Sequence, residues 1–78
     1  MAYIVCVIFG LYDRMDKTNE QVGHAAYARL SEPGIPTNSF QNMFQNMVRE
    51  LIHNMELEAN RDYPDMRIAV ISHSITEL

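Results

Sequence analysis

The chain has 78 residues, a formal net charge of −4 and a single cysteine, so we expect one small domain without an internal disulfide. A domain of this size buries only about 60% of the surface that it exposes when unfolded, and its core needs a supplement. No residues show zinc-ligand spacing, which leaves association with a second copy as the usual remedy. The acidic balance disfavours nonspecific nucleic-acid binding, although it leaves a specific RNA or DNA ligand open.

Residues 2–12 are rich in β-branched and aromatic side chains and predict a strand. Both faces of this strand are apolar, so both need cover. Cys6 lies between Val5 and Val7, and we expect a buried, unreactive thiol there. The segment is too short to span a bilayer and lacks the features of a signal peptide. We therefore expect a cytoplasmic protein without a membrane partner.

Residues 19–31 predict a helix. Thr18 is a good N-cap, with Gln21 at the capping-box position, and Pro33 favours an end to the helix just before it. The inward side chains of this helix are small, which would allow a close approach to its neighbour. They are Val22, Ala25, Ala26 and Leu30.

Residues 40–60 carry the strongest pattern of the chain. Apolar residues recur at the i, i+3, i+4, i+7 spacing that places them on one side of an α-helix. They are Phe40, Met43, Phe44, Met47, Val48, Leu51, Ile52 and Met55. The stripe is broader than a coiled-coil seam, so we expect a long helix that lies on a sheet or a second helix.

Residues 67–76 predict a second strand, whose second half turns polar at Ser72, Ser74 and Thr76. The predicted fold is α+β: a β-α-α-β unit with a two-stranded antiparallel sheet and a helical hairpin on one face. The helices would leave one apolar row of the first strand uncovered, and we assign this role to Tyr3, Val5, Val7, Phe9 and Leu11. The sequence therefore predicts a homodimer that completes the sheet, through faces or through edges.

The three histidines are the first candidates for chemistry. No two of them share one side of a helix at metal-ligand spacing, so the sequence predicts neither a metal site nor a cofactor. His24 belongs to the first predicted helix and His53 to the second. His73 lies between Ser72 and Ser74, and it is the best single candidate for a contact residue.

The outer face of the long helix carries amides where Glu and Lys are usual. Its first two turns present Gln41, Asn42, Gln45 and Asn46. Amides both donate and accept hydrogen bonds, which suits an interface, although they also serve as plain polar surface. We predict that Gln41, Gln45, Arg49 and His73 contact a partner, most simply another protein.

Small size, acidic charge and the lack of a catalytic constellation favour a non-catalytic binding protein. Such a protein acts by occupying a macromolecular partner, as do short inhibitor and accessory proteins of phages and other mobile elements. The alternative is a homodimeric small-molecule-binding protein or enzyme. Its site would be enclosed between the subunits and would use Tyr12, His24 or His73.

Overall fold

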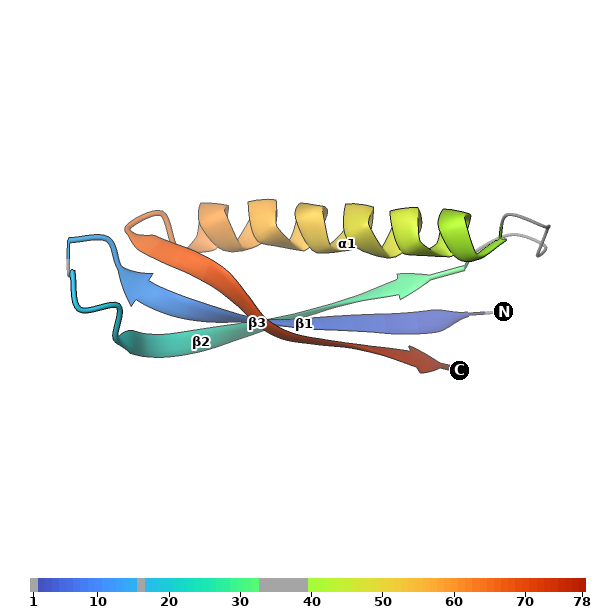
Figure 1. The fold of residues 1–78 in the computed structure, drawn as a ribbon, viewed down its shortest axis with the longest axis horizontal. Coiled ribbons are helices and arrows are strands. Elements are labelled where there is room, and N and C mark those ends of the chain that lie inside the picture. The colour runs from blue at the N-terminus through green and yellow to red at the C-terminus, as the bar shows by residue number, and fades with distance from the viewer. Residues whose placement is uncertain (1, 16, 33–39) are drawn as a thin grey trace.

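The computed structural model describes residues 2–15, 17–32 and 40–78, and for residues 40–44 the backbone alone. The elements follow in the order β1 (Tyr3–Asp13), β2 (Gln21–Ser31), α1 (Phe40–Asp62) and β3 (Met66–Glu77). The strands form one antiparallel sheet in the order β2-β1-β3, and α1 lies across one face of it (Figure 1). The protein is a small α+β fold with a three-stranded sheet and one described helix.

The helix predicted over residues 19–31 is wrong, because this segment forms strand β2. It pairs antiparallel with β1 from Tyr3↔Ser31 to Tyr12↔Gln21. The chain reverses near Asn19, whose φ of 57° is a left-handed conformation that asparagine tolerates better than most residues. Pairing with β1 from Tyr3 to Tyr12 outweighs the helix propensity of the alanines in this segment, because local propensity is weaker than tertiary pairing.

The prediction of a β-α-α-β unit with a two-stranded sheet and a helical hairpin is therefore wrong. The described elements follow in the order β-β-α-β. The expected antiparallel pairing of the first and last strands is present, from Tyr3↔Glu77 to Asp13↔Met66. Its register shifts between Ile8 and Phe9. Ile8 pairs with Ser72 and Phe9 pairs with Val70, so Ile71 is an extra residue on β3 without a partner on β1.

The long helix is confirmed, with bounds within two residues of the expected ones. Within the part of α1 whose side chains are described, the apolar stripe faces β1. Val48 and Met55 are buried in one cluster with Val5, Val7 and Phe9 of β1. Partly buried side chains of α1 pack against this cluster, namely Met47, Leu51 and Ile52.

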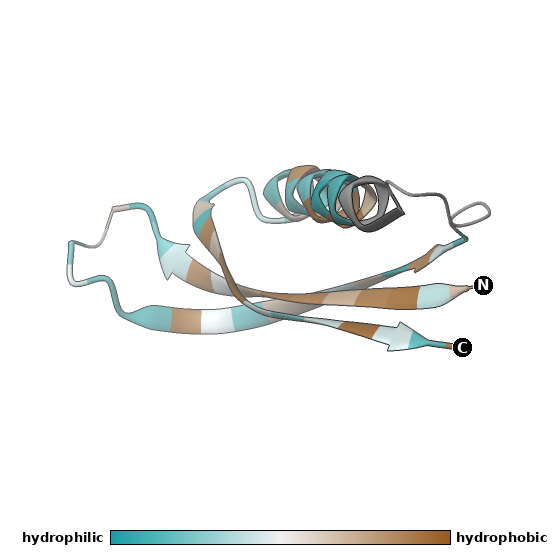
Figure 2. Ribbon diagram, turned by 45° about the vertical axis from the view of Figure 1, so that its right-hand side comes forward, coloured by the Kyte–Doolittle hydropathy of each residue, from teal (hydrophilic) through white to brown (hydrophobic). Residues whose placement is uncertain are grey.

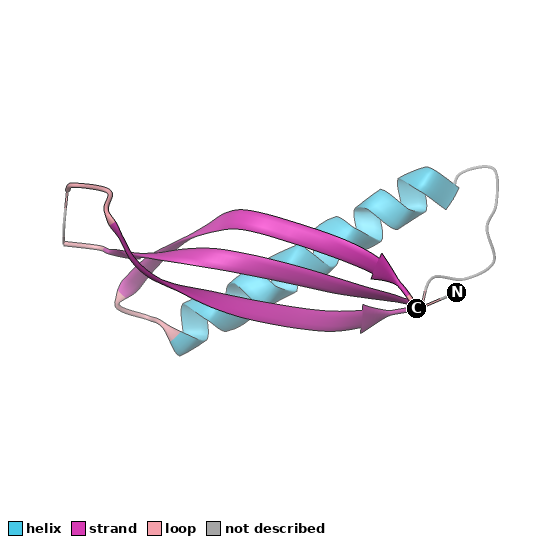
Figure 3. Ribbon diagram, turned by 90° about the horizontal axis from the view of Figure 1, so that it is seen from below, coloured by secondary structure: helices cyan, strands magenta, loops and turns pink. Residues whose placement is uncertain are grey.

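The apolar row of β1 that was expected to stay bare is the one that α1 covers. Val5, Val7 and Phe9 are fully buried, and Leu11 is nearly so. The uncovered row is the opposite one, because successive side chains of a strand point to opposite faces. Seen from below in Figure 3, no described segment lies over this second face of the sheet.

Apolar side chains populate the uncovered face. Ile4, Cys6 and Ile8 of β1 are only half-buried, so the expectation that Cys6 is buried within the chain is wrong. On the flanking strands Leu30 and Ile71 are 54% and 46% exposed. Figure 2 shows apolar segments on all three strands. A single helix cannot cover both faces of the sheet, which is why this row stays open.

Three polar contacts join α1 to β2. Tyr27 donates a hydrogen bond to Asp62, Arg29 forms an ion pair with Glu58, and the Ser31 hydroxyl contacts the sulfur of Met47. At the N-terminal end of α1 in Figure 1, β2 is the nearest strand and β3 the most distant. The helix is thus bonded to β2, and beside its N-terminal half the border between α1 and β3 is more open, whereas β3 begins next to the C-terminal end of α1 (Figure 1).

Candidate functional site

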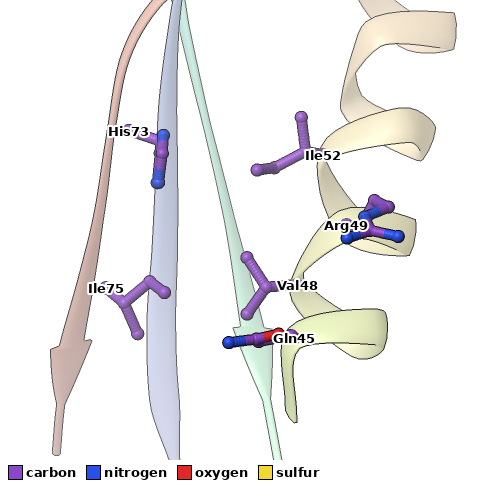
Figure 4. A pocket seen from close by; sticks show the side chains of 6 residues that line it. All are labelled: Gln45, Val48, Arg49, Ile52, His73 and Ile75. Atoms are coloured by element: carbon purple, nitrogen blue, oxygen red, sulfur yellow. The ribbon is translucent and has the colours of Figure 1, made fainter. Parts of the chain in front are cut away.

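A groove of about 410 Å³ runs between α1 and the C-terminal half of β3 (Figure 4). It is lined by Gln45, Val48, Arg49 and Ile52 of α1 and by His73 and Ile75 of β3. The helical residues follow the spacing that places them along one side of α1. The β3 residues pair with Val7 and Val5, so they point to the helix-covered face of the sheet.

The groove combines an apolar floor with cationic and hydrogen-bonding groups at its rim. Val48 is buried, whereas the purely aliphatic side chain of Ile75 is 39% exposed. Arg49 supplies five N–H donors, and the Gln45 amide both donates and accepts. No carboxylate belongs to the lining. In a chain with ten acidic residues and six Lys and Arg, this makes the groove locally basic.

A second hollow, of about 450 Å³, continues along the same border toward the C-terminal end of α1. Its lining consists of Arg14, Glu56, Asn60, Arg67 and Ile68. Positions 56 and 60 extend the line of positions 45, 49 and 52 along the helix. The guanidinium of Arg67 lies 4.8 Å from the Tyr12 ring centroid and donates to the Asn19 side chain at 2.6 Å. The α1–β3 border is thus hollowed on both halves of the helix.

The outer edge of β3 borders the groove. Within the described part of the chain β3 pairs with β1 alone, so its other side offers unpaired backbone N–H and C=O groups. Every residue from Ser72 to Glu77 is exposed. Among the features that prevent an edge strand from pairing, proline and lysine are absent from residues 66–77, and the bulge at Ile71 precedes the stretch from Ser72 to Glu77.

The structure brings together three of the four predicted contact residues. Gln45, Arg49 and His73 all line the groove. The side chain of Gln41 lies outside the described residues. The roles of all four stay predictions. The sequence analysis missed Val48, Ile52 and Ile75 as site residues, because apolar positions in a helix or strand were assigned to the core.

The other candidate residues lie apart from this groove. His24 pairs with Gly10 and faces the uncovered side of the sheet, as does Tyr12, whereas His73 faces the helix. One chain therefore does not gather the three residues of the predicted small-molecule site. His53 is exposed on α1. Among the described residues, no group of three or more His, Cys, Asp or Glu side chains is placed to hold a metal ion.

The fold and the groove define a small α+β protein with an open α1–β3 border. Comparisons with protein-family models, curated proteins and solved structures find no match for this chain. Across the described ranges, no helix combines the length and apolar character that crossing a bilayer requires.

Proposed function

We propose that this chain is a small non-catalytic binding protein that acts by occupying a partner protein through the groove between α1 and β3. The observation that carries the proposal is the convergence of Gln45, Arg49 and His73 on one apolar-floored groove. Gln45 and Arg49 share the outward side of α1, and β3 brings His73 beside them.

The composition of the groove supports recognition of a macromolecule. A few polar groups around an apolar floor are typical of sites that fix the orientation of a ligand. The groove and the second hollow lie beside successive parts of α1, whose 23 residues span about 35 Å at about 1.5 Å each. Such a length suits a polypeptide segment better than a compact metabolite. An inhibitor or accessory protein of this kind needs no catalytic group of its own.

Site-specific photo-crosslinking tests this proposal. A benzophenone amino acid replaces Gln45, at the groove, or Asn46, an exposed neighbouring amide that does not line it. In a lysate of the organism that encodes the chain, we expect a defined crosslinked protein from position 45 and not from position 46. Introduction of Arg49→Ala should abolish the crosslink. Equal labelling from both positions would contradict a groove-directed function.

The proposal also includes a homodimer, formed face to face through the uncovered side of the sheet. The apolar residues there are Ile4, Cys6, Ile8, Ala26, Ala28, Leu30 and Ile71. Small side chains such as the alanines allow two sheets to approach closely. A two-fold axis through this face would leave the groove on the opposite, helix-covered side accessible in both subunits.

The area of the uncovered face is compatible with a dimer. Strands of 11 residues extend about 36 Å at about 3.3 Å per residue, and three of them cover about 14 Å at about 4.8 Å spacing. The face is then about 500 Å² per subunit, or about 1,000 Å² for the pair, which is near the lower limit for a specific interface. The radius of gyration, 14.7 Å, exceeds the roughly 11.5 Å of a compact domain of this length, as expected for one helix on one thin sheet.

A further inference from the structure

We infer that the groove between α1 and β3 receives an extended, acidic polypeptide segment that adds a fourth strand to the sheet along β3. This inference rests on the proposed binding function and names the chemistry of its partner. It depends on three observations: the free edge of β3, the direction of the side chains beside that edge, and the charge of the groove.

The first observation is the unpaired edge. An extended segment beside β3 would satisfy backbone N–H and C=O groups that have no partner strand in the described part of the chain. Strand addition at an exposed sheet edge is a general mode of peptide recognition, in which the backbone gives affinity and alternate side chains give specificity. β2 is the other edge, and α1 is attached to it through side-chain contacts of Tyr27, Arg29 and Ser31.

The second observation concerns the side chains of the added strand. Residues directly opposite each other on neighbouring strands point to the same face of a sheet. Residues of the segment opposite His73 and Ile75 would therefore point to the helix-covered face of the sheet, beside the groove; Figure 4 shows these two β3 side chains directed toward α1. Their neighbours in sequence would lie beside Ser72, Ser74 and Thr76, which are small and uncharged. The segment then alternates groove-directed residues with small polar ones.

The third observation is charge. Arg49 and His73 are the only ionisable residues among the six that line the groove. The adjoining hollow is lined by Arg14 and Glu56, which carry opposite charges, while the guanidinium of Arg67 lies over the Tyr12 ring and donates to Asn19. A carboxylate of the segment placed opposite His73 would lie at the basic rim, and an apolar residue opposite Ile75 would fill the floor. The recognised pattern is an acidic residue and an aliphatic residue separated by one small polar residue.

A single-stranded nucleic acid also carries negative charge, but the site fits it less well. Binding of unpaired bases depends on aromatic stacking platforms, and among the residues whose side chains are described none that lines the groove is a Phe, Tyr or Trp. The backbone groups of a β-strand edge have no counterpart in a nucleic acid. Oligonucleotides therefore serve as a competing probe in the experiment.

The test uses two synthetic peptide libraries measured by fluorescence anisotropy with the full chain. The first library alternates Glu or Ile with Thr or Ser, and the second carries Lys in place of Glu. We expect the acidic library to yield binders, and N-methylation of alternate backbone amides in these binders to abolish binding. Arg49→Ala and His73→Ala should each weaken binding about tenfold, as expected for loss of one charge-assisted hydrogen bond. The controls Arg61→Ala and His53→Ala, on exposed parts of α1 outside the groove, should leave it unchanged.

A second readout locates the bound peptide. Backbone amide NMR signals of Ser72, Ser74 and Thr76 should shift, while those of β2 should not. Absence of acidic binders, equal binding of the Lys library, tolerance of N-methylation, or a preference for oligothymidylate would each overturn the inference. If position 45 still crosslinks a partner in the lysate, the proposed groove function survives without strand addition. If it does not, both fail together.

Discussion

The phenol of Tyr27 donates a hydrogen bond of 2.6 Å to the carboxylate of Asp62, which joins the middle of β2 to the last residue of α1. The Tyr27 ring also lies edge-on to Phe9, with centroids 5.8 Å apart. One side chain thus connects the central strand, an edge strand and the helix. This attachment holds the C-terminal end of α1 to β2.

Tyr27→Phe tests this attachment. We expect a loss of about 1 kcal/mol in the free energy of unfolding, the usual net contribution of one hydrogen bond. Burial of the phenol, followed by its hydrogen bond to Asp62, raises the pKa of Tyr27 from 10.0 to about 12. Because the folded pKa is the higher one, this stabilisation is complete below pH 10 and is lost as the pH rises toward 12.

The measurement is urea unfolding of the wild type and Tyr27→Phe at several pH values between neutrality and pH 11. The wild type should lose stability above pH 10 more steeply than the variant, with Tyr63→Phe as the control at an exposed tyrosine. The hydrogen bond from Tyr27 also lowers the pKa of Asp62 below 3.8. Its contribution is therefore present above that pH and is lost as the solution becomes more acidic. Parallel pH profiles for wild type and variant in this range would contradict the assignment to Tyr27.

The next prediction concerns the core between α1 and β1. Met55 is fully buried, and Met55→Ala should cost about 3 kcal/mol, because it removes apolar contacts and leaves a cavity. Leu57 lies two residues away and is 56% exposed, so Leu57→Ala should change stability by less than about 0.5 kcal/mol. Thermal or urea unfolding of the two variants measures the difference. Similar losses from both would mean that the helix does not pack through the stripe described.

The stripe that contains Met55 could be predicted from sequence because helical periodicity is a local signal. Strand β2 could not, because Val22, Ala25, Ala26 and Leu30 fit one side of a helix and small residues suit either state. Its conformation is decided by pairing with β1, which depends on residues far away in the sequence. The informative local feature was Asn19, a residue that tolerates the left-handed conformation found there.

The candidate site was predictable as separate residues but not as a groove. Gln45 and Arg49 were identified as outward polar groups, and His73 from its place among serines. Their proximity depends on β3 lying beside β1 and on α1 being attached to β2, which no local pattern shows. Ile75 was missed because an apolar residue in a strand is usually assigned to the core.

Gly10 marks a crowded point on the uncovered face of the sheet. A Cβ atom there would lie 3.1 Å from the Tyr12 ring and 3.2 Å from Cγ2 of Ile71. Gly10→Val should therefore destabilise the fold by about 1–3 kcal/mol, despite the strand preference of valine. At Gly23 a Cβ would meet only Leu11, at 3.6 Å, so Gly23→Val should cost less. A stability gain at Gly10 in urea unfolding would contradict the packing of Tyr12 and Ile71 over this residue.

The groove proposal predicts that stability and binding respond separately to substitution. Gln45 and Arg49 are exposed, so Gln45→Ala and Arg49→Ala should change the free energy of unfolding by less than about 0.5 kcal/mol. Arg49→Ala should nevertheless lose capture of the partner by the crosslinker at position 45, whereas Asn46→Ala should retain it. Full capture in the Arg49→Ala variant would show that this side of α1 is only solvent-exposed surface.

The proposed dimer makes a prediction at Cys6, which is half-buried on the uncovered face of an isolated chain. A second copy seated on this face would cover the thiol, so the rate of labelling by a thiol reagent should fall as protein concentration rises.

Ala28 pairs with Cys6 across the sheet and is exposed, so Ala28→Glu should cost little stability in the monomer. In the dimer it would bury a carboxylate without a partner, which is strongly unfavourable. We therefore expect Ala28→Glu to give the mass of one chain by light scattering and a labelling rate independent of concentration. Asn54→Glu, the same added charge on an exposed position of α1, should behave as the wild type. A wild-type mass of one chain at high concentration, together with a cooperative thermal transition, would show that the sheet tolerates its open face and would end the dimer proposal.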